Sequence, residues 1–302
     1  MNIVKNRKIW YAISGLLVAA SLFSIFYFGL NLGIDFTGGS LLEIEYLNDR
    51  PENSAIKEKI SPLNLGNISL QPTGDNGLLI RSKDLSEEEH QAILIALSET
   101  DKITETRFDS IGPVIGKELA QKSWIAMALV LAMIIFYIAF AFRKVSAGLS
   151  KTVRGVSSFK YGLMAVVALV HDVAIPTGIF AVLGKYFGAE IDILFVTALL
   201  TILGFSVHDT IVVFDRVREN LRKGVGENFE NTVGLSVSQT IARSINTSLT
   251  VLLVLLALFF FGGETTKYFS LAIIIGITAG TYSSIFLASP LLVTIHKFQR
   301  KL

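Results

Sequence analysis

Six long runs of apolar residues alternate with more polar segments along the chain. Each run holds about twenty residues or more with little charge, which is the length that an α-helix needs to cross a hydrocarbon layer of about 30 Å. The runs cover residues 9–30, 123–142, 161–183, 191–214, 241–261 and 268–295. This pattern predicts six transmembrane helices.

The segment between the first two runs has a different pattern. Residues 31–122 hold sixteen Asp and Glu against nine Lys and Arg, four of the six prolines, and short stretches with alternating apolar positions. We expect strands at residues 40–47, 67–71, 78–82 and 103–109, and helices at residues 53–60 and 86–99. Ser86 and Glu89 have the spacing of a capping box at the start of the second helix. The order βαββαβ is typical of a ferredoxin-like domain.

These patterns predict a polytopic α-helical membrane protein with six transmembrane helices and one small α+β (ferredoxin-like) extracytoplasmic domain. Residues 1–30 would form a cytoplasmic N-terminus and the first transmembrane helix, and residues 31–122 the α+β domain. Residues 123–302 would form the other five helices and a cytoplasmic C-terminus. The first run is longer than a typical signal-peptide core and no A-x-A-like site follows it, so we interpret it as an uncleaved anchor.

The composition agrees with a membrane protein, and the charges predict its orientation. Hydrophobic residues make up 51% of the chain and charged residues 17%. Lysines and arginines gather in one set of segments, whereas the short loops opposite contain only Lys185 and Lys267. The set comprises Lys5, Arg7, Lys8, Arg143, Lys144, Lys151, Arg154, Lys160, Arg216, Arg218, Arg222, Lys223, Lys297, Arg300 and Lys301. By the positive-inside rule, both termini are cytoplasmic and residues 31–122 lie outside the plasma or inner membrane.

Five ionisable residues interrupt the apolar runs. His171 and Asp172 lie in the third run, His208 and Asp209 in the fourth, and Arg243 begins the fifth. An ionisable group at the centre of a span costs about 2.5–3.5 kcal/mol on insertion scales, so such residues usually have a function. Asp209 and Arg243 lie at similar depths, counted from the outer helix ends at about 1.5 Å per residue. The sequence therefore predicts a proton relay of Asp209, Arg243, His208, Asp172 and His171.

Small polar residues accompany this relay. Asn246 and Thr247 follow Arg243 by three and four residues, and Ser206 precedes Asp209 by three, so we expect polar faces toward a hydrated bundle interior. Low dielectric favours a protonated carboxyl, whereas a neighbouring arginine favours the carboxylate, and such a balance allows loading and release. In the alternative interpretation, Arg243 extends to the cytoplasmic interface and Asp209 helps to end its span. His171 and Asp172 could likewise be packed, hydrogen-bonded groups.

Two glycine patterns indicate structural roles. Gly38 and Gly39, with Asp35 just before them, predict a tight turn where the chain leaves the membrane. Gly276 and Gly280 form a G-x-x-x-G pattern in the last run, which lets helices approach closely.

Motifs for other chemistries are absent from the sequence. It contains no P-loop, H-E-x-x-H or G-x-S-x-G motif and no cysteine. We therefore expect a protein that is not an enzyme, with no nucleotide site of its own, no cofactor, no metal and no nucleic-acid partner. The outer domain cannot contain disulfides.

Several motifs resemble those of the SecD/SecF protein-export family, and the resemblance extends over the whole chain. They are G-I-D-F-T-G-G-S at residues 33–40, L-V-H-D-V at 169–173, G-F-S-V-H-D-T-I-V-V-F-D-R-V-R-E-N at 204–220, A-R-S-I-N-T-S at 242–248 and G-T-Y-S-S-I at 280–285. The family, part of the resistance-nodulation-division superfamily, usually has Asn at the position of His208. In this family, the residues at the positions of Asp209 and Arg243 belong to the proton pathway.

The resemblance implies an accessory subunit of the Sec machinery. Such a subunit pairs with SecD, associates with the SecYEG channel and uses the proton-motive force to assist translocation of unfolded polypeptide after the SecA ATPase begins it. We expect Gly-rich and Ser-rich helix faces to pack against SecD, and the rest of the surface to face membrane lipid. Two alternatives are a proton-coupled exporter of small molecules or lipids on the same scaffold, and a passive scaffold. The single modest outer domain argues against the exporter, and the expected burial of Asp209 and Arg243 argues against the scaffold.

Overall fold

The computed structural model describes residues 3–66, 68–99, 102–141 and 158–299. It divides into an outer unit, comprising Asn31–Ile125 and Glu190–Ile193, and a helical unit formed by the rest of the chain. The predicted cationic segment at residues 143–157, Phe142, Asn67, Arg300 and Lys301 lie outside the described residues.

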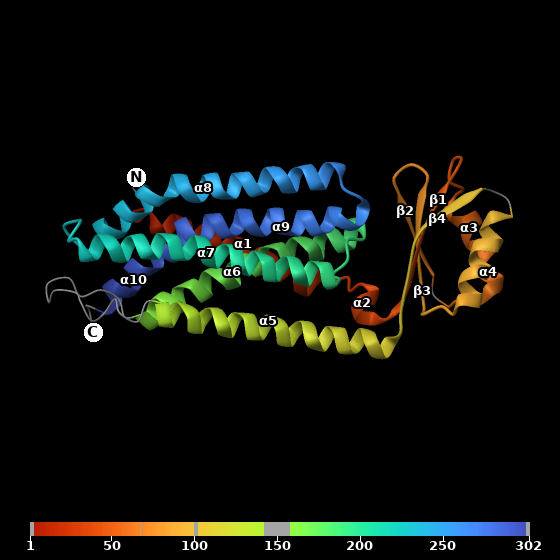
Figure 1. Cartoon of the computed structure of the whole chain (residues 1–302), viewed down its shortest axis with the longest axis horizontal. Helices are drawn as coiled ribbons and strands as arrows, with labels where there is room; N and C mark the ends of the chain where they lie inside the picture. Colours follow the sequence, from red (N-terminus) through yellow and green to blue (C-terminus); the bar gives the residue numbers. More distant parts are fainter. Residues whose placement is uncertain (1–2, 67, 100–101, 142–157, 300–302) are drawn as a thin grey trace. The chain divides into compact units, whose positions relative to one another are not determined.

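The outer unit contains a four-stranded antiparallel sheet in the order β2-β3-β1-β4. Its elements are α2 (Ile34–Thr37), β1 (Gly39–Tyr46), α3 (Asn53–Ile60), η1 (Ser61–Leu63), β2 (Ser69–Thr73), β3 (Gly77–Ser82), α4 (Glu87–Ser98) and β4 (Ile103–Ile111). Helices α3 and α4 cover one face of the sheet (Figure 1). This is the predicted ferredoxin-like order, and each predicted strand and helix begins and ends within two residues of its observed bounds.

The alternation of apolar residues explains which face of the sheet is covered. Leu42, Ile44 and Tyr46 of β1 and Leu78 and Ile80 of β3 are buried together with apolar residues of α3 and α4. Successive strand residues point to opposite faces, so only every second residue enters this core. The predicted capping box is present: Ser86 Oγ accepts from Glu89 N, and Glu89 Oε2 accepts from Ser86 N at 3.0 Å.

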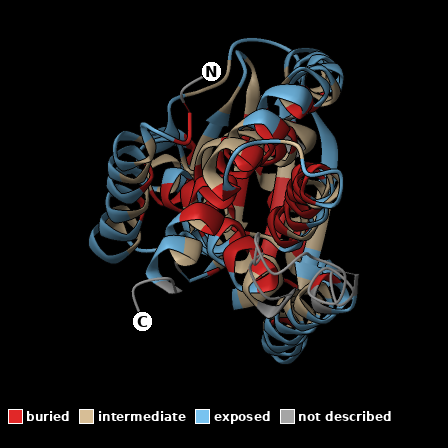
Figure 2. Ribbon diagram, turned by 90° about the vertical axis from the view of Figure 1, so that its left-hand side faces the viewer, coloured by how far each residue is buried: buried red, intermediate tan, exposed pale blue. Residues whose placement is uncertain are grey.

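The helical unit consists of long helices, and six segments of the described chain are long and apolar enough to cross a membrane. They are α1 (Arg7–Phe28), α5 (Pro113–Ala141), α6 (Ser158–Phe187), α7 (Ile193–Arg222), α8 (Phe229–Phe261) and the sequence α9 (Glu264–Ser283), η2 (Ser284–Ala288) and α10 (Ser289–Gln299). Buried residues line the inward faces of these helices and exposed residues the outward faces (Figure 2). The fold class predicted from the sequence is confirmed.

Several helices are longer than the apolar runs that predicted them. α8 begins at Phe229, twelve residues before the fifth apolar run at 241. Its polar first turns pack against the end of α7, where Asn220 Nδ2 donates to Ser236 Oγ at 2.8 Å and Arg216 Nε donates to Gln239 Oε1 at 2.6 Å. An apolar run marks only the residues suited to lipid, so it does not include the polar turns at the end of a helix.

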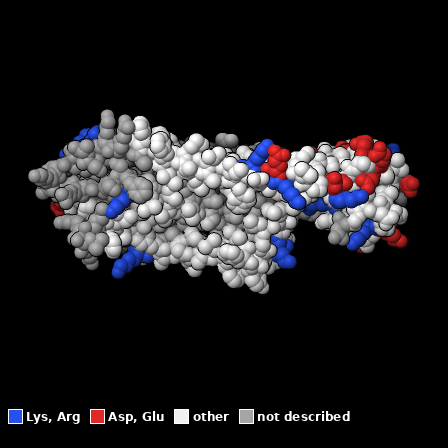
Figure 3. All heavy atoms as spheres, turned by 90° about the horizontal axis from the view of Figure 1, so that it is seen from below, with Lys and Arg blue, Asp and Glu red and all other residues white. Residues whose placement is uncertain are grey.

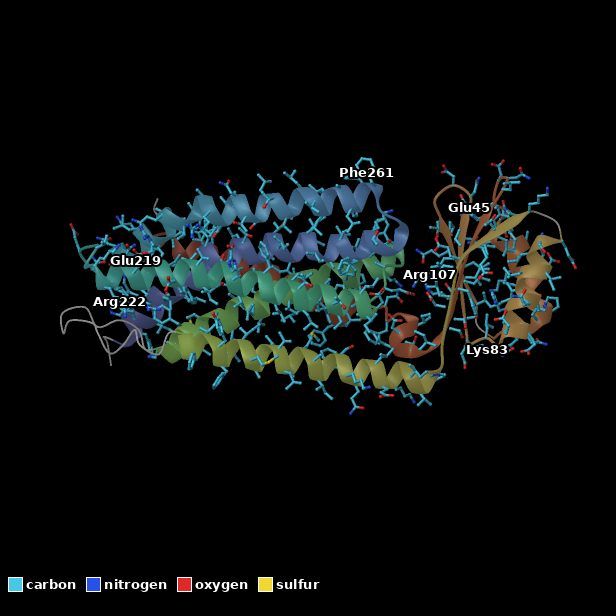
Figure 4. All side chains as sticks on the ribbon, in the orientation of Figure 1. Glu45, Lys83, Arg107, Glu219, Arg222 and Phe261 are labelled. Atoms are coloured by element: carbon cyan, nitrogen blue, oxygen red, sulfur yellow. The ribbon has the colours of Figure 1, made fainter. Side chains whose placement is uncertain are left out.

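The outward surface of the helical unit suits a lipid environment. Large apolar side chains such as Leu16, Phe26, Phe136, Val254 and Phe261 are exposed. On the face seen in Figure 3, charged side chains lie toward the two ends of this unit and leave an uncharged band between them. Glu219 and Arg222 near the end of α7, and Phe261 at the end of α8, mark those opposite ends (Figure 4).

The predicted turn at Asp35, Gly38 and Gly39 lies in the outer unit. Gly38 and Gly39 have φ angles of 74° and 131°, and a Cβ on either would lie 2.7 Å from backbone atoms of Pro113 or Ser82. Only glycine combines ready access to a positive φ angle with the absence of a Cβ that would clash. Asp35 Oδ2 accepts a hydrogen bond from the amide of Ile193 at 2.9 Å, so this turn also holds the first residue of α7.

Candidate functional site

Asp172 lies at the centre of a buried polar cluster in the helical unit. Its carboxyl group is fully buried, and Oδ2 accepts hydrogen bonds from Ser206 of α7 at 2.5 Å and from Ser283 of α9 at 2.7 Å. His171 Nδ1 lies 2.8 Å from Oδ1. Pro176, four residues further along α6, has no N–H to donate to the backbone carbonyl of Asp172. Three helices therefore meet at this carboxyl group.

His171 extends the cluster toward the first helix. Its ring stacks on Tyr282 with centroids 5.9 Å apart, and Ser14 of α1 donates to the Tyr282 hydroxyl at 3.2 Å. His171 Nε2 is buried without a hydrogen-bond partner among the described residues. The sequence could not predict that these adjacent residues would share one cluster, because neighbours on a helix point in directions about 100° apart.

Asp209 is buried one turn further along α7 than Ser206. Ser284, the first residue of η2, donates to Asp209 Oδ2 at 3.4 Å. The fully buried Ser244 of α8 also faces this carboxyl group, although its hydroxyl has no hydrogen bond of normal geometry within the described part of the chain. The partners of Asp209 are therefore neutral hydroxyl groups, and none of the ion pairs between described residues includes this carboxyl.

Gly276 and Gly280 place α9 directly against α7. A Cβ on Gly276 would lie 2.2 Å from Ile202 Cδ1, and one on Gly280 would lie 3.0 Å from Ser206 Cβ. This glycine-rich face therefore packs within the chain, and any face that contacts SecD lies elsewhere. The residue that follows α9, Ser284, contacts Asp209 on the same helix α7.

The predicted polar face of α8 points away from the bundle interior of this chain. Arg243 and Asn246 are exposed and Thr247 is half-buried, whereas Ser244 and Ser248 are buried. Arg243 forms no ion pair with a described residue, so the predicted contact between Arg243 and Asp209 is not present in this conformation. The inward face of α8 carries Ser244 and Ser248 instead. Each residue along a helix is rotated by about 100° from the one before it, so Ser244 points inward while Arg243 points outward.

His208 also lies on an outward face. It is exposed on α7, in line with exposed Thr201 and Gly204, and it interacts with the adjacent Asp209 through electrostatics rather than through a hydrogen bond. Of the five predicted relay residues, the structure thus brings His171 and Asp172 together, and the consecutive Ser283 and Ser284 contact Asp172 and Asp209, respectively. Arg243 and His208 remain on the surface of the chain. Among the described residues, no group of three His, Asp or Glu could hold a metal ion.

The sequence interpretation did not include Ser244, Ser283, Ser284 or Tyr282 among the site residues. Ser283 and Ser284 entered the sequence analysis only as part of the family motif at residues 280–285. The adjacent positions of Ser283 and Ser284 in an apolar run could have identified them as site residues, because two neighbouring polar residues on a buried helix can contact two different helices.

The fold and the site define a polytopic membrane protein with two buried carboxyl groups in its spans and a ferredoxin-like outer domain. The C-terminal family of SecD/SecF protein export membrane proteins matches residues 92–298, and the SecD/SecF GG motif matches residues 23–46. The chain belongs to the SecD/SecF family of protein export membrane proteins.

Individual relatives agree with this family. The protein translocase subunit SecF of Thermobaculum terrenum is 44% identical over 306 residues, which cover 97% of this chain and 93% of the relative. The subunit SecF of Anaerolinea thermophila is 39% identical over 297 residues, with the same coverage. The crystal structure of SecDF from Thermus thermophilus, a translocon-associated membrane protein, is 31% identical with a TM-score of 0.84. It matches 98% of this chain, which spans only 38% of that longer chain.

Proposed function

We propose that this protein is a proton-driven accessory subunit of the Sec protein-export machinery. The observation that carries the proposal is Asp209, a buried carboxyl group in a membrane span whose hydrogen-bonding neighbours are serine hydroxyls. A low-dielectric site without a cation favours the protonated carboxyl, and the approach of a cation favours release of the proton. Asp209 is therefore suited to bind a proton in one conformation and release it in another.

Arg243 is the cation best placed to cause this release. It is adjacent to Ser244, the residue of α8 that faces Asp209 in this structure. A rotation of α8 by about 100° would exchange Ser244 for Arg243 at that position. His171 and Asp172 supply a second group that can exchange protons, and Ser206 connects it to α7.

The outward polar residues support a partnership with SecD. An arginine exposed to lipid within a span is costly, so Arg243 at the start of the fifth apolar run, and Asn246 one turn further on, require cover by another membrane protein. The Thermus thermophilus relative is named SecDF, and this chain matches only 38% of it. We infer that SecD covers these residues, and that the pair associates with the SecYEG channel after SecA has begun translocation.

The topology fits a function on the outer side of the cell membrane. With Arg7, Arg222 and Lys297 on the cytoplasmic side, both termini are cytoplasmic and the outer unit lies outside. We infer that its acidic surface contacts unfolded polypeptide as it emerges. One charge moved through 100 mV is worth about 2.3 kcal/mol, which is comparable to the cost of a charge within the membrane, so proton movement can drive a conformational change.

The proposal predicts a specific loss on substitution of Asp209. Asp209→Asn keeps the shape of the side chain and removes its titration, so insertion and assembly should persist while the gradient-dependent part of export is lost. The measurement is export into sealed vesicles with and without a proton gradient. Arg243→Met should give the same loss, because it removes the cation that triggers release.

His208→Asn is the matched control, because it alters the adjacent, exposed residue of the same helix and should leave gradient-dependent export intact. If Asp209→Asn retains the full stimulation by the gradient, Asp209 is not the proton carrier and the proposal is wrong.

A further inference from the structure

A π-helical turn interrupts the last span next to the two carboxyl groups. The turn, η2, comprises Ser284–Ala288 and directly follows Ser283, the last residue of α9. Pro290 has no N–H to donate to the carbonyl of Phe286 four residues earlier. Ser289 Oγ donates to the carbonyl of Ser284, the first residue of the turn, at 2.8 Å. π-turns are rare within α-helices and occur frequently at functional sites.

The two serines at the start of this turn contact different carboxyl groups. Ser283 Oγ lies 2.7 Å from Asp172 Oδ2 on α6, and Ser284 Oγ lies 3.4 Å from Asp209 Oδ2 on α7. Both serines are fully buried. Consecutive residues on a helix point about 100° apart, so adjacent serines can contact carboxyl groups on two different helices. The backbone between Ser283 and Ser284 therefore links the positions of the two hydroxyl groups.

We propose that Ser283 and Ser284 are positioning residues that couple the protonation of Asp172 to that of Asp209. The inference rests on the proposed function, since it requires that Asp209 takes up and releases a proton. A carboxylate accepts a stronger hydrogen bond from a hydroxyl than a neutral carboxyl does. Protonation of Asp172 therefore loosens Ser283, and the π-turn transmits this change of position to Ser284 and Asp209.

The surroundings contain few other groups that could provide the coupling. His171 of α6 pairs with Asp172 Oδ1, and Tyr282 of α9 stacks on the His171 ring. Arg243 of α8 lies on an exposed face, and His208 of α7, also exposed, interacts electrostatically with Asp209 but makes no hydrogen bond to Asp172 or Asp209 among the described residues. From α7 and α8, the uncharged Ser206 and Ser244 complete the inward side. Ser206 donates to Asp172 only. Among the described residues, Ser283 and Ser284 are the adjacent pair in which one residue donates to Asp172 and the next donates to Asp209.

The test is infrared titration of the carboxyl bands in the full chain, reconstituted in lipid vesicles together with SecD. Asp172→Asn and Asp209→Asn assign the two bands. Ser283→Ala removes a donor from Asp172 only, and loss of a hydrogen bond to an ionised group should shift the Asp172 titration by about one pH unit toward higher pH. Coupling predicts a smaller shift of the Asp209 band in the same variant, and a reciprocal shift of the Asp172 band in Ser284→Ala.

Ser270→Ala is the control, because Ser270 is a fully buried serine of the same helix whose hydroxyl bonds to the backbone carbonyl of Lys267. Ser270→Ala should move neither band. Ser283→Thr keeps the hydroxyl that Ser283→Ala removes, so both bands should titrate as in the wild type. If Ser283→Ala and Ser284→Ala each move only the band of the carboxyl they contact, the coupling is wrong while the proton relay stands. If no band in the wild type disappears in Asp209→Asn, the proposed function itself fails, and the coupling with it.

Discussion

Single residues in this protein act through the space they leave as well as through their charge. Gly276 and Gly280 have no side chain, and for that reason α9 packs directly against α7 beside Ser206, which donates to Asp172 Oδ2. The carboxyl group of Asp172 then has hydrogen-bond partners for both oxygens, which offsets the cost of burying it. Packing and polar chemistry are thus two effects of the same close contact.

Substitution of Gly276 tests this contact. Gly276→Ala would place a methyl group 2.2 Å from the fully buried Ile202, so we expect the free energy of unfolding to fall by about 1–3 kcal/mol. The measurement is reversible unfolding of the full chain in detergent. Gly204→Ala is the control: no atom lies within 4 Å of its added Cβ, and alanine in a helix interior is more favourable than glycine by about 0.5–1 kcal/mol. Equal effects of the two substitutions would contradict the close packing.

At the scale of elements, the segment between α6 and α7 is part of the outer unit. Ile191 donates its amide to the carbonyl of Asn31 at 2.7 Å and accepts from the amide of Gly33 at 2.9 Å. Glu190 forms an ion pair with Arg81 of β3. Burial raises the pKa of Glu190 most, Arg81 partly offsets this effect, and Asp192 and Asp35 raise the pKa further. A single short segment thus joins the start of α7 to the sheet and contains a titratable group.

The raised pKa of Glu190 predicts how local stability depends on pH. A carboxyl group whose pKa is higher in the folded state contributes stability below its unfolded value, about 4.3, and loses this contribution as the pH rises through its folded value. Glu190→Gln removes this titration. The free energy of local opening, measured by hydrogen exchange at residues 77–82, should therefore favour the wild type over Glu190→Gln most at acidic pH.

The exposed Glu45 of β1 supplies the control, because Glu45→Gln changes a carboxyl group that is not buried. A difference between wild type and Glu190→Gln that grows with rising pH would show that the ion pair with Arg81 outweighs burial.

At the scale of the whole molecule, the outward faces of α7 and α8 carry polar residues within membrane spans. Thr201 and His208 on α7, and Arg243, Asn246 and Thr250 on α8, are exposed. Neighbouring exposed residues such as Leu249, Leu253 and Val254 are apolar and suit lipid. A polar stripe within an apolar surface indicates contact with another protein, because lipid offers no hydrogen bonds.

This surface predicts a stable complex. In cells that also make SecD, the chain extracted in mild detergent should copurify with SecD, identified by mass spectrometry. Arg243→Leu combined with Asn246→Leu should weaken the complex, because the polar contacts are lost, whereas Phe261→Leu at the exposed end of α8 should leave it intact. Recovery of the wild type only as a monomer or homodimer would refute the prediction.

The sequence by itself determined the elements and the chemistry available to the protein. The apolar runs predict the six spans because lipid requires a fixed length of apolar helix, and the alternation in residues 31–122 predicts the ferredoxin-like order because strands bury every second residue. Asp172 and Asp209 were identifiable because a carboxyl group within a span is costly without a function. These inferences depend on local periodicity and composition, which are properties of the chain before it folds.

Only the tertiary structure decided which residues meet. Depth along the helices suggested that Arg243 faces Asp209, but depth does not determine rotation, and the packing of α8 turns Ser244 inward and Arg243 outward. The contacts of Ser283 and Ser284 likewise depend on the glycines of α9, the π-turn and the positions of α6 and α7. One residue of offset on a helix changes direction by about 100°, and only the contacts between helices select among these directions.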